Sequence, residues 1–218
     1  MGTKVLVACE ESQAVAIEFR RLGIEAYSCD ILPCSGGHPE WHIQGDVLPL
    51  LKQDWAMVIA FPPCTYLTSA GTRHYSLKMN PEWKVNERLR KREDAVRFFM
   101  ACVNANAPMV AVENPVGYMN THYKKPSQII HPYYFGDAYL KRTCLWLKGL
   151  PNLIPTDMLP KPEPMYICEG EKCKGKKIYW AEGIKAGKGG QEERAKQRSK
   201  TFPGIARAMV EQWSGYVK

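Results

Sequence analysis

Two residues have the types and settings that catalytic chemistry requires. Cys64 comes directly after two prolines, and Glu113 begins the triplet Glu-Asn-Pro. Because proline fixes φ and removes a backbone donor, the turn before Cys64 is stiff and points its thiol in one direction. A thiolate is a nucleophile and a carboxyl group is a general acid, so the pair suits covalent catalysis. Taken singly, each fits a structural role equally well, as a buried cysteine beside a turn or as an acid that ends a strand.

Apolar runs precede both residues and indicate the elements that position them. The runs are short and continuous, which is typical of strands buried on both faces of a parallel sheet. We expect strands at 4–8, 24–29, 57–60 and 108–112. We expect helices at 13–22, capped by Ser12, from 81 to 103, capped by Asn80, and at 205–213. This alternation predicts an α/β fold with a doubly wound sheet, in which ligands bind beyond the carboxyl ends of the strands. Adjacent strands would then bring Cys64 and Glu113 to one crevice.

The composition bounds the class of protein. The chain has 218 residues, of which 45% are hydrophobic, and this suits a single domain, 1–218, with a core of its own. No segment has the pattern of a signal peptide or the roughly 20 apolar residues that span a bilayer, so we expect a cytoplasmic protein without membrane partners. The eight cysteines are scattered, and we expect reduced thiols rather than a disulfide framework.

The charge of the chain favours an anionic partner. Its net charge is +8, and its pI is near 9.0. Much of the excess positive charge lies in a basic insertion at about 151–197, which is rich in Pro, Gly and Lys. Within the overlapping range 161–200 there are 11 Lys or Arg and 6 Asp or Glu. Nucleic acid is the partner that such a balance suggests. We interpret the charges of the 81–97 helix as an ordinary solvated face.

A metal site is the alternative interpretation of the cysteines in the insertion. Cys168 and Cys173 could pair with the distant residues Cys34, His38 and His42. The spacing is not that of a common zinc site, and the two halves lie far apart in sequence. We therefore expect plain loop cysteines and no metal.

The motifs and their order resemble those of DNA cytosine-5 methyltransferases. Phe-Pro-Pro-Cys, ending at Cys64, resembles the proline-cysteine motif of the family, and the triplet from Glu113 resembles its Glu-Asn-Val motif. Lys141-Arg142-Thr143 stands where the family has an arginine beside the target cytosine, and 201–206 resembles the closing motif of the cofactor pocket. Nearly the whole chain is similar to short phage-encoded DNA cytosine methylase-like proteins, which share the pattern that starts at Arg198. A phage-encoded member would act in the host cytoplasm.

This resemblance implies a fold, a cofactor and roles for particular residues. The fold is the Rossmann-like sheet of class I S-adenosylmethionine-dependent methyltransferases. Cys64 is the nucleophile that adds to carbon 6 of cytosine, Glu113 contacts the ring nitrogen, and Arg142 holds the carbonyl. The cofactor is S-adenosyl-L-methionine. The positions expected to bind it are Ala8, Cys9, Glu10, Glu11, Ser12, Asp30, Ile31, Asp46, Val47, Phe61 and Pro62.

The expected substrate is DNA, and two departures from the family pattern keep alternatives open. The stretch after the first strand contains no glycine, and only about residues 145–197 are available to recognise a target sequence. RNA or a free cytosine nucleotide is an alternative substrate, and a catalytically inactive relative that binds nucleic acid or protein is the alternative function. The residues expected to contact nucleic acid, mainly through phosphates, are Arg73, Lys141, Lys174, Lys176 and Lys177.

Overall fold

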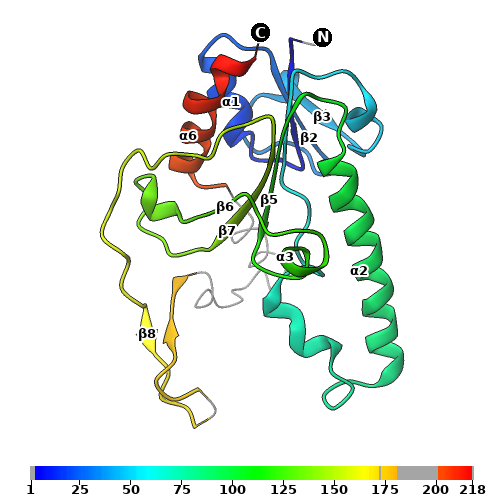
Figure 1. Cartoon of the computed structure of the whole chain (residues 1–218), viewed down its shortest axis with the longest axis vertical. Helices are drawn as coiled ribbons and strands as arrows, with labels where there is room; N and C mark the ends of the chain where they lie inside the picture. The colour runs from blue at the N-terminus through cyan, green and yellow to red at the C-terminus, as the bar shows by residue number, and fades with distance from the viewer. Residues whose placement is uncertain (1–2, 172, 181–200, 218) are drawn as a thin grey trace.

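A computed structural model describes residues 3–171, 173–180 and 201–217. Its centre is a seven-stranded sheet with the order β3-β2-β1-β4-β5-β7-β6 (Figure 1). The strands are β1 Val5–Ala8, β2 Ala26–Asp30, β3 His42–Gln44, β4 Met57–Ala60, β5 Met109–Pro115, β6 Gln128–Ile130 and β7 Thr143–Lys148. The pairs from β3 to β5 are parallel, whereas β7 runs antiparallel to both of its neighbours. The mostly parallel α/β sheet that the sequence predicts is confirmed.

Helices cover both faces of the sheet because the central strands bury alternate residues in opposite directions. Val5 and Val7 of β1 join the core under α1 (Ala14–Arg21) and α6 (Pro203–Trp213). Leu6 and Ala8 join the second core, under α2 (Glu82–Val103) and the short α3 (Met119–His122). The continuous apolar runs in the sequence therefore reflect burial on two sides. The single-turn 3-10 segments are η1 Pro39–Trp41, η2 Leu50–Lys52, η4 Pro132–Tyr134 and η5 Ser214–Tyr216, and η3 is longer, Ser69–Tyr75.

Both helix caps predicted from the sequence are wrong. α1 has Gln13 at its N-cap, and its first N–H groups are bonded by the carboxylate of Glu10 rather than by Ser12. α2 has Pro81 at its N-cap, and the amide of Asn80 donates instead to carbonyls of the preceding loop. At both helix starts a hydrogen bond with a neighbouring turn replaces the predicted cap. The path of that turn cannot be predicted from the local sequence.

A hairpin arm, residues 160–180, leaves the core after β7. Its strands are β8 Tyr166–Ile167 and β9 Lys177–Ile178, which pair antiparallel. Cys168 and Cys173 form a disulfide across its turn, so the prediction that all the cysteines are reduced is wrong for this pair. The turn brings their Cα atoms to 5.7 Å, a distance typical of disulfides. The other six cysteines are thiols.

The segment that contains this arm is fastened to the core at both ends. Before the arm, the backbone N–H and C=O of Ile154 bond the side-chain amide of Gln212 in α6, each at 2.8 Å. After it, the N–H of Gly204 donates to Asp137 at 2.8 Å. Gly204 lies so close to the carbonyl of Phe135 that a Cβ there would come within 1.8 Å of the oxygen, so only glycine fits. Residues 181–200, which include most of the basic insertion's second half and the start of the Arg198 pattern, lie outside the described residues. Within the described ranges, no helix has the length and apolar character needed to cross a bilayer.

Candidate active site

The predicted site residues stand in one row at the carboxyl ends of the parallel strands. The register places Ala8 of β1 level with Cys29 of β2 and with Ala60 of β4, and Ala60 level with Val112 of β5. The residues that follow these four are Cys9, Asp30, Phe61 and Glu113. The chain order reverses between β1 and β4, and this is the place where doubly wound sheets bind ligands.

The turn that carries Cys64 is held from two sides. Phe61 donates its N–H to the carbonyl of Ala8 at 2.9 Å, which ties the turn to β1. The side-chain amide of Asn114 donates to the carbonyl of Pro62 at 2.9 Å, and this bond is buried. Pro62 therefore has an acceptor role inside the core, and Cys64, which is half-buried, follows it at the open edge.

The loop after Cys64 is paired with the loop after Glu113. Tyr118 donates its N–H to the carbonyl of Leu67 at 2.7 Å, and Ser69 donates to the carbonyl of Val116 at 3.2 Å. Gly117 lies between these bonds, and a Cβ there would come within 2.0 Å of the Leu67 oxygen. The glycine permits a close approach that joins the two motifs.

Glu113 has the burial expected of a carboxyl group that exchanges a proton. Its Oε1 is buried and has no hydrogen-bond partner in the described part of the chain. Burial raises the pKa of the Glu113 carboxyl above its ordinary value, and the positive charge of Lys141 opposes that shift. A carboxyl group in this setting holds its proton to higher pH than one in water does, so it can donate to a ligand.

The antiparallel strand β7 brings a pair of cations to the same edge. Thr143 pairs with Pro115, so the residues before β7 lie beside the end of β5. Arg142, predicted to contact the cytosine carbonyl, is exposed, and its charge together with burial lowers the pKa of His131. Lys141 is half-buried, and its charge is the one that acts on Glu113. The charge of Lys141 therefore acts on the acid of the site, whereas that of Arg142 acts on His131 and Cys144.

The loop between β1 and α1 has the backbone of a glycine-rich turn without any glycine. Cys9 has φ of 60° and Gln13 has φ of 58°, both in the left-handed region. This region costs a residue with a side chain about 1–2 kcal/mol, and such strain gathers at functional sites. Glu11 contributes its carbonyl, which accepts from Ser35 at 2.8 Å, and Ser12 is half-buried beside it.

Glu10 is the residue of this loop whose position differs most from its expected role. Its carboxylate accepts from the N–H groups of Val15 at 2.7 Å and Ala16 at 3.3 Å, at the N-terminus of α1. The residue is only 3% exposed, and burial raises the pKa of its carboxyl group to about 8, although the two backbone donors oppose the shift. Glu10 thus occupies the anion position of the helix N-terminus itself.

Two further carboxylates lie at the ends of β2 and β3. Asp30 and Asp46 each accept a bond from the backbone two residues on, Leu32 at 2.9 Å and Leu48 at 3.0 Å. Gly45 donates to the carbonyl of Asp30 at 2.8 Å, which ties the two loops together.

The neighbours of these acids differ in burial. Ile31 is 74% exposed and Val47 is buried, so one apolar side chain projects from this edge while the other packs below it.

Most other cysteines are unsuited to attack a substrate. Burial raises the pKa of the thiols of Cys9 and Cys144, and it raises the pKa of Cys29 to about 11 and of Cys102 to about 12. These thiols stay protonated at neutral pH, and a thiol reacts through its thiolate. In the described residues, no group of three or more His, Cys, Asp or Glu side chains is arranged to hold a metal ion.

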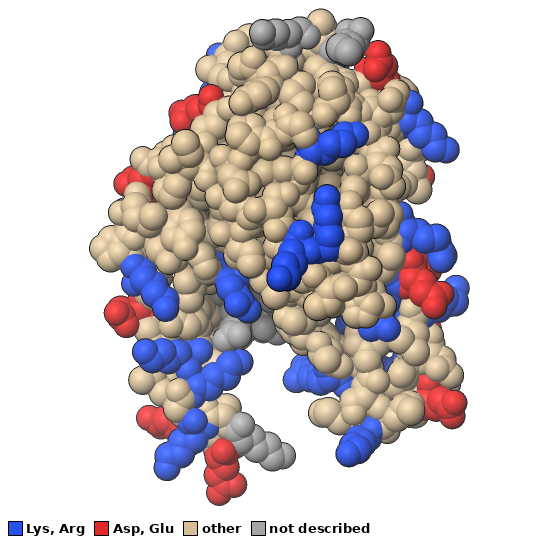
Figure 2. All heavy atoms as spheres, in the orientation of Figure 1, with Lys and Arg blue, Asp and Glu red and all other residues tan. Residues whose placement is uncertain are grey.

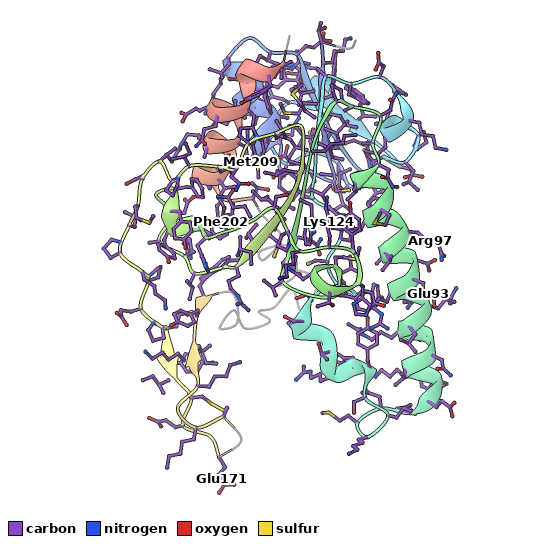
Figure 3. The ribbon with its side chains drawn as sticks, in the orientation of Figure 1. Glu93, Arg97, Lys124, Glu171, Phe202 and Met209 are labelled. Atoms are coloured by element: carbon purple, nitrogen blue, oxygen red, sulfur yellow. A yellow bond between two sulfur atoms is a disulfide. The ribbon has the colours of Figure 1, made fainter. Side chains whose placement is uncertain are left out.

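Apart from Lys141, which precedes β7 beside the end of β5, the basic residues predicted to contact nucleic acid fall on two separate arms. Lys174, Lys176 and Lys177, the hairpin lysines, are exposed on the hairpin arm, and Glu171 lies at its tip (Figure 3). Arg73 is exposed in η3, beside the lower half of α2. Figure 2 shows an open gap between the two arms, with Lys and Arg side chains on either side.

A described cavity lies away from this row. It has a volume of about 210 Å³ and is lined by Val103, Asn104, Val110, Tyr123, Lys124, Trp146, Leu147 and Lys148. Val110 and Lys148 pair at the amino end of β5, so the cavity is at the opposite end of the sheet from Cys64. It brings together no nucleophile and no acid.

Sequence reasoning missed the contribution of Asn114 and the capping role of Glu10. Asn114 directly follows Glu113, and a polar residue inside an otherwise buried strand end is the signal that it has a partner. No family model matches this chain, and no curated protein matches its sequence.

Proposed function

We propose that the chain is an S-adenosylmethionine-dependent methyltransferase that modifies carbon 5 of cytosine in DNA, with Cys64 as the nucleophile. One observation carries the proposal. The turn of Cys64 and the end of β5 at Glu113 are fastened to each other by the buried bond from Asn114 to Pro62 and by the paired loops that follow. A structural cysteine and a strand-ending acid need no such connection.

Cys64 and Glu113 have the chemistry that covalent catalysis on a pyrimidine requires. The Cys64 thiolate forms a C–S bond to carbon 6, and protonated Glu113 donates to the ring nitrogen that would otherwise become negative. The pair of electrons that reaches carbon 5 then makes this carbon a nucleophile. S-adenosylmethionine, when bound, supplies an electrophilic methyl group. Loss of the proton from carbon 5 to a base then breaks the C–S bond and releases the thiolate, and the ring nitrogen returns its proton to Glu113. The burial that raises the pKa of Glu113 favours its protonated form, which is the form that can donate to the ring nitrogen.

The edge beside β1 and β2 has residues that fit such a cofactor. Asp30, at the end of β2, is half-buried and presents a carboxylate suited to ribose hydroxyl groups. Ile31 beside it is exposed, and an apolar side chain at a ligand edge suits the face of an adenine. The carboxylate of Glu10 already bonds the N-terminus of α1, so the cofactor's own carboxylate would bind elsewhere.

A nucleic-acid substrate is supported by the charge on the arms. The hairpin lysines and Arg73 face solvent on different arms, with the gap of Figure 2 between them. A cytosine stacked in a duplex exposes neither ring face to a thiolate, so the base must leave the stack to react. Basic arms that bind the phosphates on either side of the target nucleotide would hold the strand while its base leaves the stack.

The experiment that tests the proposal is covalent trapping on duplex DNA that contains 5-fluorocytosine. After methyl transfer, fluorine stands where a proton must leave, so the C–S bond persists and the protein stays attached to DNA. We expect an adduct with wild type and none with Cys64→Ser, because a hydroxyl is far less ionised than a thiol. Glu113→Gln should slow adduct formation by about 100-fold, the effect of losing a positioned acid.

Controls separate the chemistry from folding and from the choice of substrate. Cys102→Ala, at a buried cysteine of α2, should still trap DNA in proportion to its folded fraction. RNA and dCMP with the same fluorinated base test the alternative substrates. Methylation of carbon 5 by Cys64→Ser at the wild-type rate would refute the nucleophile, and a folded wild type that methylates none of the three would refute the function.

A further inference from the structure

Two arginines of α2 contact aromatic rings of the loop that follows Cys64. The guanidinium of Arg88 lies 5.0 Å from the ring centre of Tyr66 and 5.1 Å from that of Tyr75. Arg92, one helical turn further on, lies 4.4 Å from the ring centre of Tyr75. Both arginines are half-buried, so the interpretation of this helix as an ordinary solvated face is wrong for them.

A pocket of about 160 Å³ lies between this loop and α2. We call it the α2 pocket; it is lined by Tyr66, His74, Lys84, Glu87, Arg88 and Lys91. Three cations thus face one carboxylate. Glu87 is paired with Lys91 at 2.6 Å, whereas Lys84 forms no ion pair with any residue that the structure describes. The lining has an excess of positive charge that its own carboxylate does not balance.

The donors of Arg88 indicate which ligand suits the pocket. Its Nη2 donates to the carbonyl of Thr65 at 3.2 Å, and its buried Nε has no acceptor among the described residues. Stacking on the tyrosines uses the face of the guanidinium, and the N–H groups lie along its edge. A tetrahedral anion with several oxygens matches such an edge, and lysines bind it as point charges. Thr65 is the neighbour of Cys64, so an anion on Arg88 would lie close to the nucleophile.

We propose that the α2 pocket binds one backbone phosphate of the nucleic-acid strand that carries the target base. This rests on the proposed function, which supplies the strand. The α2 pocket would contact a phosphate and no base edge, so its contribution to affinity should not depend on the nucleotide sequence. The position of the pocket beside the Cys64 loop distinguishes this phosphate from those that the hairpin lysines would contact.

Two substitutions that change the charge of the α2 pocket in opposite directions test the proposal. The probe is a short fluorescein-labelled DNA duplex, and its single strand in parallel, with affinity measured by anisotropy without cofactor between about 50 and 200 mM salt. Lys84→Gln should weaken binding and reduce the slope of log K against log salt by about 0.9 for the duplex or about 0.7 for the strand, the value of one phosphate contact. Glu87→Gln should strengthen binding, because it releases Lys91. Arg90→Gln, at an exposed arginine of the same helix outside the pocket, is the matched control and should leave the slope near that of wild type.

The outcomes separate this proposal from the proposed function. Equal slopes for Lys84→Gln and Arg90→Gln, or weaker binding by Glu87→Gln, would overturn the phosphate site even if the enzyme methylates DNA. Pocket-dependent binding without any methyl transfer would support the phosphate site and leave the methyltransferase proposal refuted. A wild type that binds neither duplex nor single strand at low salt would overturn both.

Discussion

The buried carboxyl group of Glu10 should make the stability of the fold depend on pH in an unusual direction. Its ordinary pKa is 4.5, and burial under α1 raises it to about 8 in the folded chain. Below the ordinary pKa, both the folded and the unfolded chain hold the proton, and Glu10 opposes folding least. As the pH rises toward 8, the unfolded chain has lost its proton while the folded chain retains it, so the free energy of unfolding falls.

The size of the effect follows from the two pKa values. Each pH unit of difference corresponds to about 1.36 kcal/mol. Raising the pKa from 4.5 to about 8 therefore lowers the free energy of unfolding by up to about 5 kcal/mol between about pH 4.5 and pH 8, with little further change above pH 8.

Urea unfolding of wild type and Glu10→Gln across this range measures the effect. Glutamine keeps an oxygen that can accept from Val15 but cannot ionise, so the difference between the two curves isolates Glu10. We expect the stability of wild type relative to Glu10→Gln to fall by several kcal/mol between about pH 5 and pH 8. Glu93→Gln, at an exposed glutamate of α2 (Figure 3), is the control and should run parallel to wild type. Parallel curves for wild type and Glu10→Gln would refute the reasoning, as would a difference that grows in favour of wild type with rising pH.

Three further sets of substitutions have expected results. Asp30→Ala should weaken binding of S-adenosylhomocysteine by about 1–3 kcal/mol in calorimetry, the scale of a lost polar contact, and unchanged affinity would remove Asp30 from the cofactor site. Asn114→Ala should lower the free energy of unfolding, measured in urea, by about 1–2 kcal/mol, because the Pro62 carbonyl loses its donor. The loss is limited to this range because the substitution also removes the buried Oδ1 of Asn114, which has no partner in the described residues. The same variant should slow methylation, and a full rate would show that Cys64 needs no such support. Replacing the three hairpin lysines together by glutamine should flatten the salt dependence of DNA affinity, and an unchanged slope would mean that they contact no phosphate.

The strands that carry the site could be predicted from the sequence because their burial is uniform. Val5–Ala8 and Met57–Ala60 are buried at every position, and both appear in the sequence as unbroken apolar runs. Parallel strands have their carboxyl ends at the same edge of the sheet, so the residues that follow them meet at that edge. The row that includes Cys9, Asp30 and Glu113 could therefore be predicted from the positions at which the strands end.

The remaining features depend on contacts between distant segments. Glu10 caps α1 across a turn in which Cys9 and Gln13 adopt left-handed conformations, and no local preference favours those residues there. The stacking of Arg88 on Tyr75 depends on the path of η3, because charges spaced along a helix look alike whether they face water or a ring. The disulfide between residues 168 and 173 depends on the hairpin that brings them together.

The fastening of residues 154 and 204 to the core has a consequence for how this chain can diversify. Because the polypeptide enters and leaves the intervening segment at two points bonded to α6 and to the loop after η4, changes of length or sequence between them need not alter the sheet. The segment between Ile154 and Gly204 can therefore be exchanged as one unit, and under the proposed function such an exchange would alter the contacts with nucleic acid. A chimera joined at Ile154 and Gly204 should therefore keep the sheet and the row at its strand ends, while its affinity for nucleic acid changes with the segment that it receives.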